Sequence, residues 1–366
     1  MLGKFLPFMA DQGPPLEREK RLWQASMDGE LETVTTLTKT RVDVNWVGVD
    51  KGDTPLHRAC RFGHLEVVKV LLDHRKIEVN KGNQWGATPF FIACQQGHKA
   101  IVLHLLADPR VDVVLPDEDG TFPFNQAAWN GQPEVVSLLL YDSRIDPNST
   151  NKSKGTALFV ALESGRSDVA WLLLSDPRTR HNLPDNSGCT PLWMASQNGH
   201  LPTAQLLFAS ERSIDTKARS KARKKTAEDQ ARWAATQQTT WDNVIYDDPR
   251  RRQRDCPLIA DLICEYELDP EAVRRRLRQL PEIRKIYVGH LFALVVFFSD
   301  GFLRPIPATT PPATVRFLRI CSRLPLDLQM VICNRMFGSP KNIVSSRDSE
   351  PGFKWIFRIM YWLELP

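Results

Sequence analysis

Two histidines and a cysteine lie close together in the sequence, at His57, Cys60 and His64. Imidazole nitrogens and a thiolate can bind a transition metal, and a histidine near a cysteine can activate a nucleophile. A metal site would need further ligands at a fixed spacing. The seven cysteines of the chain, however, form no CxxC pair and no such spacing with histidine. The same stretch also recurs along the chain, which favours an architectural role for these residues.

Glycine and alanine recur every 34 residues through the first 200 positions. The glycine series is Gly29, Gly63, Gly97, Gly131, Gly165 and Gly199. The alanine series is Ala25, Ala59, Ala93, Ala127, Ala161 and Ala195. A fixed period over six units is typical of a repeat architecture, in which each unit buries its apolar face against its neighbours.

Each unit predicts two short helices. A Thr-Pro pair such as Thr54-Pro55 or Thr88-Pro89 provides a capping oxygen followed by a residue suited to the first helical turn. The recurring glycine ends this helix, because glycine adopts positive φ without strain. A second apolar segment such as HLEVVKVLLD at 64–73 predicts the second helix.

The stretch T-P-L-H-x-A at 54–59, followed by G-H-L-E-V-V at 63–68, resembles the ankyrin repeat. The resemblance covers residues 22–209 and implies a β-hairpin finger and two antiparallel helices per unit, with one residue more than the usual 33. It also implies that His57 bonds locally and helps to set the finger. Cys60 and Cys94 are expected to be core thiols. Units with Phe122 in place of Thr and Ala157 in place of Pro should be less regular.

The expected fold is mainly α, an ankyrin-repeat solenoid followed by a small, mainly helical domain. We expect a flexible segment at 1–20, six repeats at 21–209, a basic linker at 210–255 and the helical domain at 256–366. A weaker half-repeat at 224–236 would cap the array. The stretches LFALVVFFSDG and LPLDLQMVICNRMFGS resemble a C-terminal segment attached to ankyrin arrays in fungal and protist proteins.

Charge is unevenly distributed along the 366 residues, whose net charge is +5. Residues 1–209 hold 21 basic and 24 acidic side chains, whereas residues 210–366 hold 27 and 19. The basic runs at 216–225 and 250–254 could be import signals, phosphate-binding patches, or a solvated helix or linker. The longest apolar run, at 286–298, is short of the roughly 20 residues of a membrane-spanning helix. We expect a soluble protein of the cytoplasm or nucleus.

No strong catalytic pattern is found in the sequence: it has no P-loop, GxGxxG, HExxH or GxSxG motif. The acidic stretch DEDG at 117–120 lies in a segment that returns the chain to the next unit, where acids are commonly solvated. His290 is a single histidine in an apolar run, which is typical of a core residue. We therefore expect no enzymatic activity, no cofactor and no metal.

The function predicted from the resemblance is a scaffold that binds a partner protein on the concave surface of fingers and first helices. Three rows of first-helix positions are expected to face that surface. The first row is Arg61, Gln95, Trp129, Glu163 and Gln197, in which Trp129 is an indole among polar side chains. The second row is Phe62, Gln96, Asn130, Ser164 and Asn198, and the third row is Arg58, Ile92, Gln126, Val160 and Met194. The predicted partner-binding residues are Arg58, Arg61, Phe62, Trp85, Gln95, Gln96, Trp129 and Asn130. Two alternatives stay open. Trp129 and Phe62 could pack on neighbouring units, and the array could deliver a basic C-terminal domain to nucleic acid or to an acidic partner.

Overall fold

The computed structural model describes residues 15–48, 51–210, 212–237 and 249–283. These residues contain helices and turns, and no β-strand is assigned among them. The helices are α1 (Pro15–Asp28), α2 (Leu31–Thr38), α3 (Pro55–Phe62), α4 (Leu65–Leu72), α5 (Pro89–Gln96), α6 (Lys99–Ala107), α7 (Pro123–Asn130), α8 (Pro133–Leu140), α9 (Ala157–Glu163), α10 (Ser167–Ser175), α11 (Pro191–Asn198), α12 (Leu201–Ala209), α13 (Ala227–Ala235), α14 (Pro249–Leu268) and α15 (Pro270–Arg278).

The helix starts follow the threonine pattern. The side chains of Thr54, Thr88 and Thr156 each accept a hydrogen bond from the backbone N–H three residues later. Phe122 provides no such cap, yet α7 keeps the usual length because Pro123 begins it. The helix that begins at Ala157 is one residue shorter than α3 or α5. The expected irregularities are therefore local.

The helix ends follow the glycine pattern. Gly63 and Gly97 have φ values of 83° and 80°, so each adopts the left-handed conformation at the end of its first helix. This confirms the predicted role of the glycine series at these two positions.

The fingers are closed loops rather than strand-forming hairpins. In the finger before α5, Asn83 N–H donates to the Ala87 carbonyl, and the Asn83 side chain accepts the N–H groups of Trp85 and Ala87. Between adjacent fingers, the Glu118 N–H donates to the Trp85 carbonyl at 2.8 Å. One such bond joins each pair of adjacent fingers among the described residues, which is too short a ladder for a strand assignment.

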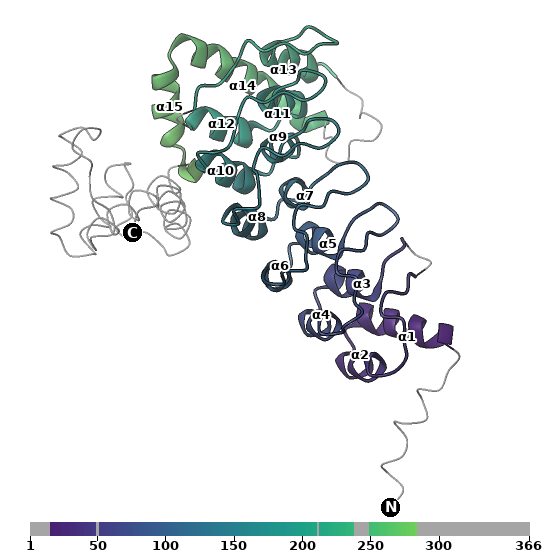
Figure 1. Cartoon of the computed structure of the whole chain (residues 1–366). Coiled ribbons are helices and arrows are strands. Elements are labelled where there is room, and N and C mark those ends of the chain that lie inside the picture. The colour runs from purple at the N-terminus through teal and green to yellow at the C-terminus, as the bar shows by residue number, and fades with distance from the viewer. Residues whose placement is uncertain (1–14, 49–50, 211, 238–248, 284–366) are drawn as a thin grey trace, which may run out of the picture. The chain divides into compact units, whose positions relative to one another are not determined.

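Two compact units divide the chain. The first comprises residues 1–173, 178–195 and 218–224, and the second comprises residues 174–177, 196–217 and 225–366. Within the first unit, the first helices α1, α3, α5, α7 and α9 pack in a row, each on the next. The second helices α2, α4, α6 and α8 form a parallel row (Figure 1).

Within the second unit, α13 packs along α14, and this pair resembles the helix pairs of the repeats. Thr226 caps α13 in the same way that Thr54 caps α3. Cys256 of α14 is fully buried, and its Sγ donates to the Ser196 carbonyl at 3.2 Å. The half-repeat predicted at 224–236 is thus a helix, and α14 supplies the second helix of its pair.

The domain boundaries differ from the prediction at two places. Residues 15–20, expected to be flexible, belong to α1, where Glu19 is buried. The boundary expected between 255 and 256 falls inside α14, because Arg252, Asp255 and Cys256 share one buried face of that helix. The first residues of the predicted helical domain, from 256, form the end of α14 and the helix α15, as expected. The rest of that domain, with the apolar run and His290, lies outside the described residues.

Candidate functional site

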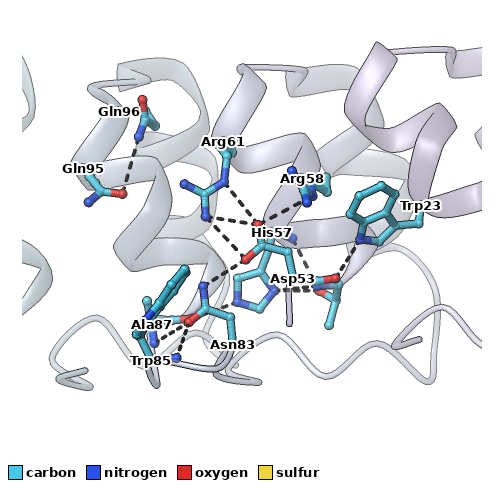
Figure 2. Close-up of polar contacts among 11 residues, drawn as sticks. Trp23, Asp53, His57, Arg58, Arg61, Asn83, Trp85, Ala87, Gln95 and Gln96 are labelled. Carbon is cyan, nitrogen blue, oxygen red and sulfur yellow. Dashed lines mark hydrogen bonds and ion pairs between the residues drawn. The ribbon is translucent and has the colours of Figure 1, made fainter. Parts of the chain in front are cut away.

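His57 is an architectural residue. Its Nδ1 accepts the Thr54 N–H at 3.2 Å, and its Nε2 donates to the Ala87 carbonyl of the next finger at 2.9 Å (Figure 2). Burial lowers the pKa of this imidazole to about 4, so the ring is neutral at pH 7. The ring holds the helix start to the finger, which confirms the predicted role.

Asp53 is the centre of the polar network in Figure 2. The carboxylate is fully buried and accepts hydrogen bonds from Arg61 Nε at 3.2 Å and from Asn83 Nδ2 at 2.9 Å. Arg58 Nε lies 3.6 Å from the same carboxylate, and the Arg58 guanidinium lies 4.0 Å from the centre of the Trp23 ring. The two arginines therefore neutralise a buried charge of their own chain.

Burial removes Arg58 from the predicted binding surface. Its side chain is only 5% exposed, because it lies between Trp23 and Asp53. Most of the third row is also buried, at Ile92, Val160 and Met194. The expectation that this row faces the surface is therefore wrong for Arg58 and Ile92. Val160 and Met194 are buried, but both line the pocket described below.

The other predicted residues of the early repeats lie at the surface. Phe62 on α3 and Trp85 in the following finger are each 47% exposed. On α5, Gln96 Nε2 donates to Gln95 Oε1 at 3.4 Å (Figure 2). Arg61 is partly exposed, but its guanidinium is paired with Asp53. These residues offer apolar and amide groups, and the cation is already neutralised.

The residues that follow the helix-ending glycines join adjacent repeats. His64 Nε2 donates to the Met27 carbonyl at 2.8 Å, and His98 Nε2 donates to the Arg61 carbonyl at 3.0 Å. Gln132 and Arg166 make the equivalent bonds to the carbonyls of Gln95 and Trp129. A Cβ added at the helix-ending glycine of the previous repeat would overlap the donor side chain, as at Gly29 with His64 and at Gly63 with His98, which explains the glycine there.

Trp129 lies at a pocket in the first unit. The cavity has a volume of about 320 Å³ and lies among the first helices α7, α9 and α11 and the fingers before them. Its lining is Thr121, Asn125, Gln126, Trp129, Asn151, Ser153, Gly155, Phe159, Val160, Glu163, Asp185 and Met194. Of the predicted partner-binding residues, Trp129 alone is among these lining residues. Asn130 is adjacent on α7, and its Nδ2 donates to the Gln126 carbonyl at 3.0 Å.

Two carboxylates line this pocket, from Glu163 on α9 and from Asp185 in the finger before α11. Burial, together with the charge of Asp185, raises the pKa of Glu163 to about 7. Asp185 Oδ1 accepts the Cys189 N–H at 2.8 Å, which closes the finger. The pocket therefore combines the indole of Trp129 with two carboxyl groups, and that of Glu163 is partly shielded from water.

Asn125 also lines the pocket, and no motif in the sequence singled it out. It occupies the position of His57, and its Nδ2 donates to the Gly155 carbonyl as His57 Nε2 does to Ala87. The residue is 1% exposed, and its Oδ1 has no hydrogen-bond partner among the described residues.

Glu163 and Asp185 were not predicted as site residues, although the 34-residue period relates both positions to residues of known role. Asp185 follows Asn83, Asp117 and Asn151 at the 34-residue period, and all four close a finger through a side-chain oxygen. Asp117, the first residue of the DEDG stretch, has this structural role. Glu163 lies in the same row as Trp129, so the repeat alignment places both on one face.

The arginines of the basic C-terminal half contact their own unit. Arg252 is fully buried, Arg251 Nε donates to the Asn198 carbonyl at 3.3 Å, and Arg254 pairs with Asp255. On α15, Arg274 and Arg278 donate to the carbonyls of Ser210 and Ala209 at the end of α12. These contacts favour the interpretation of the run at 250–254 as part of a helix surface.

The described residues contain no group of three His, Cys, Asp or Glu side chains that could hold a metal ion. Burial raises the pKa of the thiols of Cys60 and Cys94, so both stay protonated in the core. Among the helices that the structure describes, none has the length and apolar character needed to cross a membrane.

A family model described as "Ankyrin repeats (3 copies)" matches this chain twice, at residues 22–117 and 124–219. These segments make up more than half of the chain. The chain belongs to the ankyrin-repeat family. This confirms the resemblance seen in the sequence, and ankyrin repeats generally mediate interactions between proteins.

Two individual proteins are similar to parts of this ankyrin-repeat chain. A segment of 59 residues is 41% identical to the palmitoyltransferase AKR1 of Lachancea kluyveri. That segment makes up 16% of this chain and 8% of the yeast protein, so the match does not extend that protein's activity to this chain. The ankyrin repeat domain of Bcl-3, a member of the IkappaB protein family, is 24% identical with a TM-score of 0.49. The alignment covers 60% of this chain and 94% of that domain.

Proposed function

We propose that this protein is a non-catalytic interaction scaffold, which binds a segment of a partner protein on its first-helix face. We define this face as the surface of α3, α5, α7, α9 and the start of α11, with the fingers that precede these helices. The observation that supports the proposal is the pocket of about 320 Å³ beside Trp129. A tryptophan at a concave site is a typical anchor of a protein interface.

The partner-binding set follows from burial. Phe62 and Trp85 are large and exposed, and they extend the face on the side of the early repeats. Arg58 is excluded because it is buried, and Arg61 contributes little charge because Asp53 neutralises it. The contact residues are therefore Phe62, Trp85, Gln95, Gln96, Trp129 and Asn130, with Glu163 and Asp185 added from the pocket.

The proposal is tested by selecting peptides that bind the full chain. A phage-displayed library of random peptides is panned against the wild-type protein, and the selected peptides are then measured against Trp129→Ala. We expect these peptides to lose binding to that variant. The matched control is Leu103→Ala, which truncates an exposed apolar side chain on the second helix α6. Peptides that bind Trp129→Ala as well as the wild type would overturn the assignment of the face.

A further inference from the structure

The pocket beside Trp129 differs in chemistry from the rest of the first-helix face. Among the twelve residues that line the pocket, the ionisable side chains are Glu163 and Asp185, and both are acids. The ionisable groups of the lining itself are therefore acidic, which suits a positively charged ligand group.

The charge of Asp185 affects the pKa of Glu163. Burial is the main cause that raises the pKa of Glu163, and the negative charge of Asp185 adds to it. The same two acids and burial raise the pKa of Cys189 to about 12, while Arg223 lowers it, so this nearby thiol is neutral. A cation placed beside the acids would favour the charged form of Glu163 and so oppose the effects of burial and of Asp185 on its pKa.

The neutral groups of the pocket suit the same ligand. An indole attracts a cation through its ring face, and desolvation strengthens that attraction. Asn125 lines the pocket, and its Oδ1 is a buried acceptor without a hydrogen-bond partner among the described residues. An unpartnered buried acceptor favours a ligand that donates hydrogen bonds.

We propose that the Trp129 pocket binds a basic side chain, lysine or arginine, that a partner protein inserts between the indole and the carboxylates of Glu163 and Asp185. This inference rests on the proposed function, because the side chain belongs to the segment bound on the first-helix face. The stem of the basic side chain lies along Phe159 and Met194, and its charged end meets the acids. An acidic segment is repelled from the same pocket.

The test uses the peptides selected on the full chain. In each peptide, lysine is replaced by norleucine or arginine by citrulline, which removes the charge and keeps a stem of similar length. We expect one such replacement to weaken binding about tenfold or more, because the charged hydrogen bonds to the carboxylates are lost. The variant Glu163→Gln should bind the unmodified peptides more weakly and discriminate less between the two forms.

Control and pH measurements complete the experiment. Glu134→Gln makes the same chemical change at an exposed position on α8 and should leave affinity unchanged. Affinity for the wild type should rise about tenfold between pH 6 and pH 8, because the charged fraction of Glu163 rises through its pKa of about 7. Glu163→Gln should show a smaller rise.

The outcomes separate the two proposals. Binding that depends on Trp129 but not on a basic residue overturns the inference and leaves the scaffold function in place. Binding that is independent of Trp129 overturns both. Binding that depends on Trp129, on Glu163 and on one basic residue supports both.

Discussion

At the scale of single residues, the histidines and acids of this chain are explained by burial. His57 is neutral because it is surrounded by the core, and its two ring nitrogens have opposite roles in hydrogen bonding. The pKa of Glu163 is raised, which favours the protonated form, by burial and by the negative charge of Asp185. The two groups give stability opposite dependences on pH, and each can be measured separately.

Acidification should destabilise the protein through His57. The unfolded chain protonates this histidine near pH 6.5, whereas the folded chain resists protonation down to about pH 4. Stability is therefore lost as pH falls through this window, by about 3 kcal/mol at pH 4. His57→Asn keeps a donor for Ala87, as Asn125 does for Gly155, and removes the titration.

Urea unfolding at a series of pH values checks this prediction. We expect His57→Asn to be less stable than the wild type at pH 7, since the ring bonds to Thr54 are lost. The difference should shrink as the pH falls toward 4. A difference that stays constant over this range would contradict a neutral, buried His57.

Neutralising Glu163 should stabilise the folded protein at alkaline pH. The folded pKa of about 7 lies above the unfolded value, so the stabilising contribution of this group is complete below pH 4.5 and is lost as pH rises through 7. At pH 8, Glu163→Gln should raise the free energy of unfolding by roughly 2–3 kcal/mol. Equal stabilities of the variant and the wild type at pH 5 and pH 8 would count against a desolvated acid in the pocket.

At the scale of elements, each first helix begins at a threonine cap or a proline and ends before a left-handed glycine. The bonds from His64, His98, Gln132 and Arg166 then join one unit to the unit before it. A residue near the middle of such a row supports units on both sides. Damage there should therefore extend further than damage at the first unit.

Gly97→Ala should destabilise the array more than Gly29→Ala. Both glycines have positive φ, so alanine costs about 1–2 kcal/mol at either position. In both variants the new methyl overlaps the side chain that joins the next unit, which is Gln132 for Gly97 and His64 for Gly29. The difference comes from the neighbours, because α5 packs against both α3 and α7, whereas α1 packs against α3. Thermal melting of the two variants measures the difference.

The double variant Gly97→Ala with Gln132→Ala is the control. It removes the overlapping side chain, so alanine at 97 should then cost only the backbone penalty of about 1–2 kcal/mol. Equal melting losses for Gly29→Ala and Gly97→Ala would show that the position in the row does not matter.

The sequence was sufficient to predict the helix pairs, because the caps and the ending glycines are local signals with a strict period. It was not sufficient to separate buried from exposed positions in the first helices. Arg58 shares a row with Ile92 and Val160, and a repeat alignment alone does not show that the row faces the next helix. The partner of Arg58, Trp23, lies in a unit without the Thr-Pro signal.

The pocket was predicted in part. Trp129 stood out because it is an indole in a row of polar residues, and it does line a cavity. Asp185 comes from a finger of a later repeat, and its place beside Glu163 in the pocket lining depends on how the fingers stack. That arrangement is a property of the fold, and no local pattern near Glu163 indicates it.

At the scale of the whole molecule, the acidic array and the basic C-terminal half could bind different partners. The arginines of α14 and α15 are bonded within the second unit, to carbonyls at Asn198, Ala209 and Ser210. They also pair with acids, as Arg254 does with Asp255. These contacts hold several of the guanidinium groups against their own unit.

We therefore expect the full chain to bind polynucleotides weakly at physiological salt. Fluorescence anisotropy with labelled duplex DNA at salt concentrations between about 0.05 M and 0.15 M measures this directly. Tight binding that falls steeply with salt, and that is lost when Arg250, Arg251 and Arg254 are neutralised, would favour nucleic acid as the partner.

The central claim is that Trp129 anchors a partner rather than the fold. The measurement is the affinity of the full chain for a selected peptide, taken together with the melting temperature, for the wild type and Trp129→Ala. We predict that affinity falls at least about thirtyfold, the equivalent of about 2 kcal/mol, while the melting temperature falls by less than about 4 °C. A sharp fall in the melting temperature, with affinity that follows only the loss of folded protein, would show that Trp129 is a packing residue and would contradict the account.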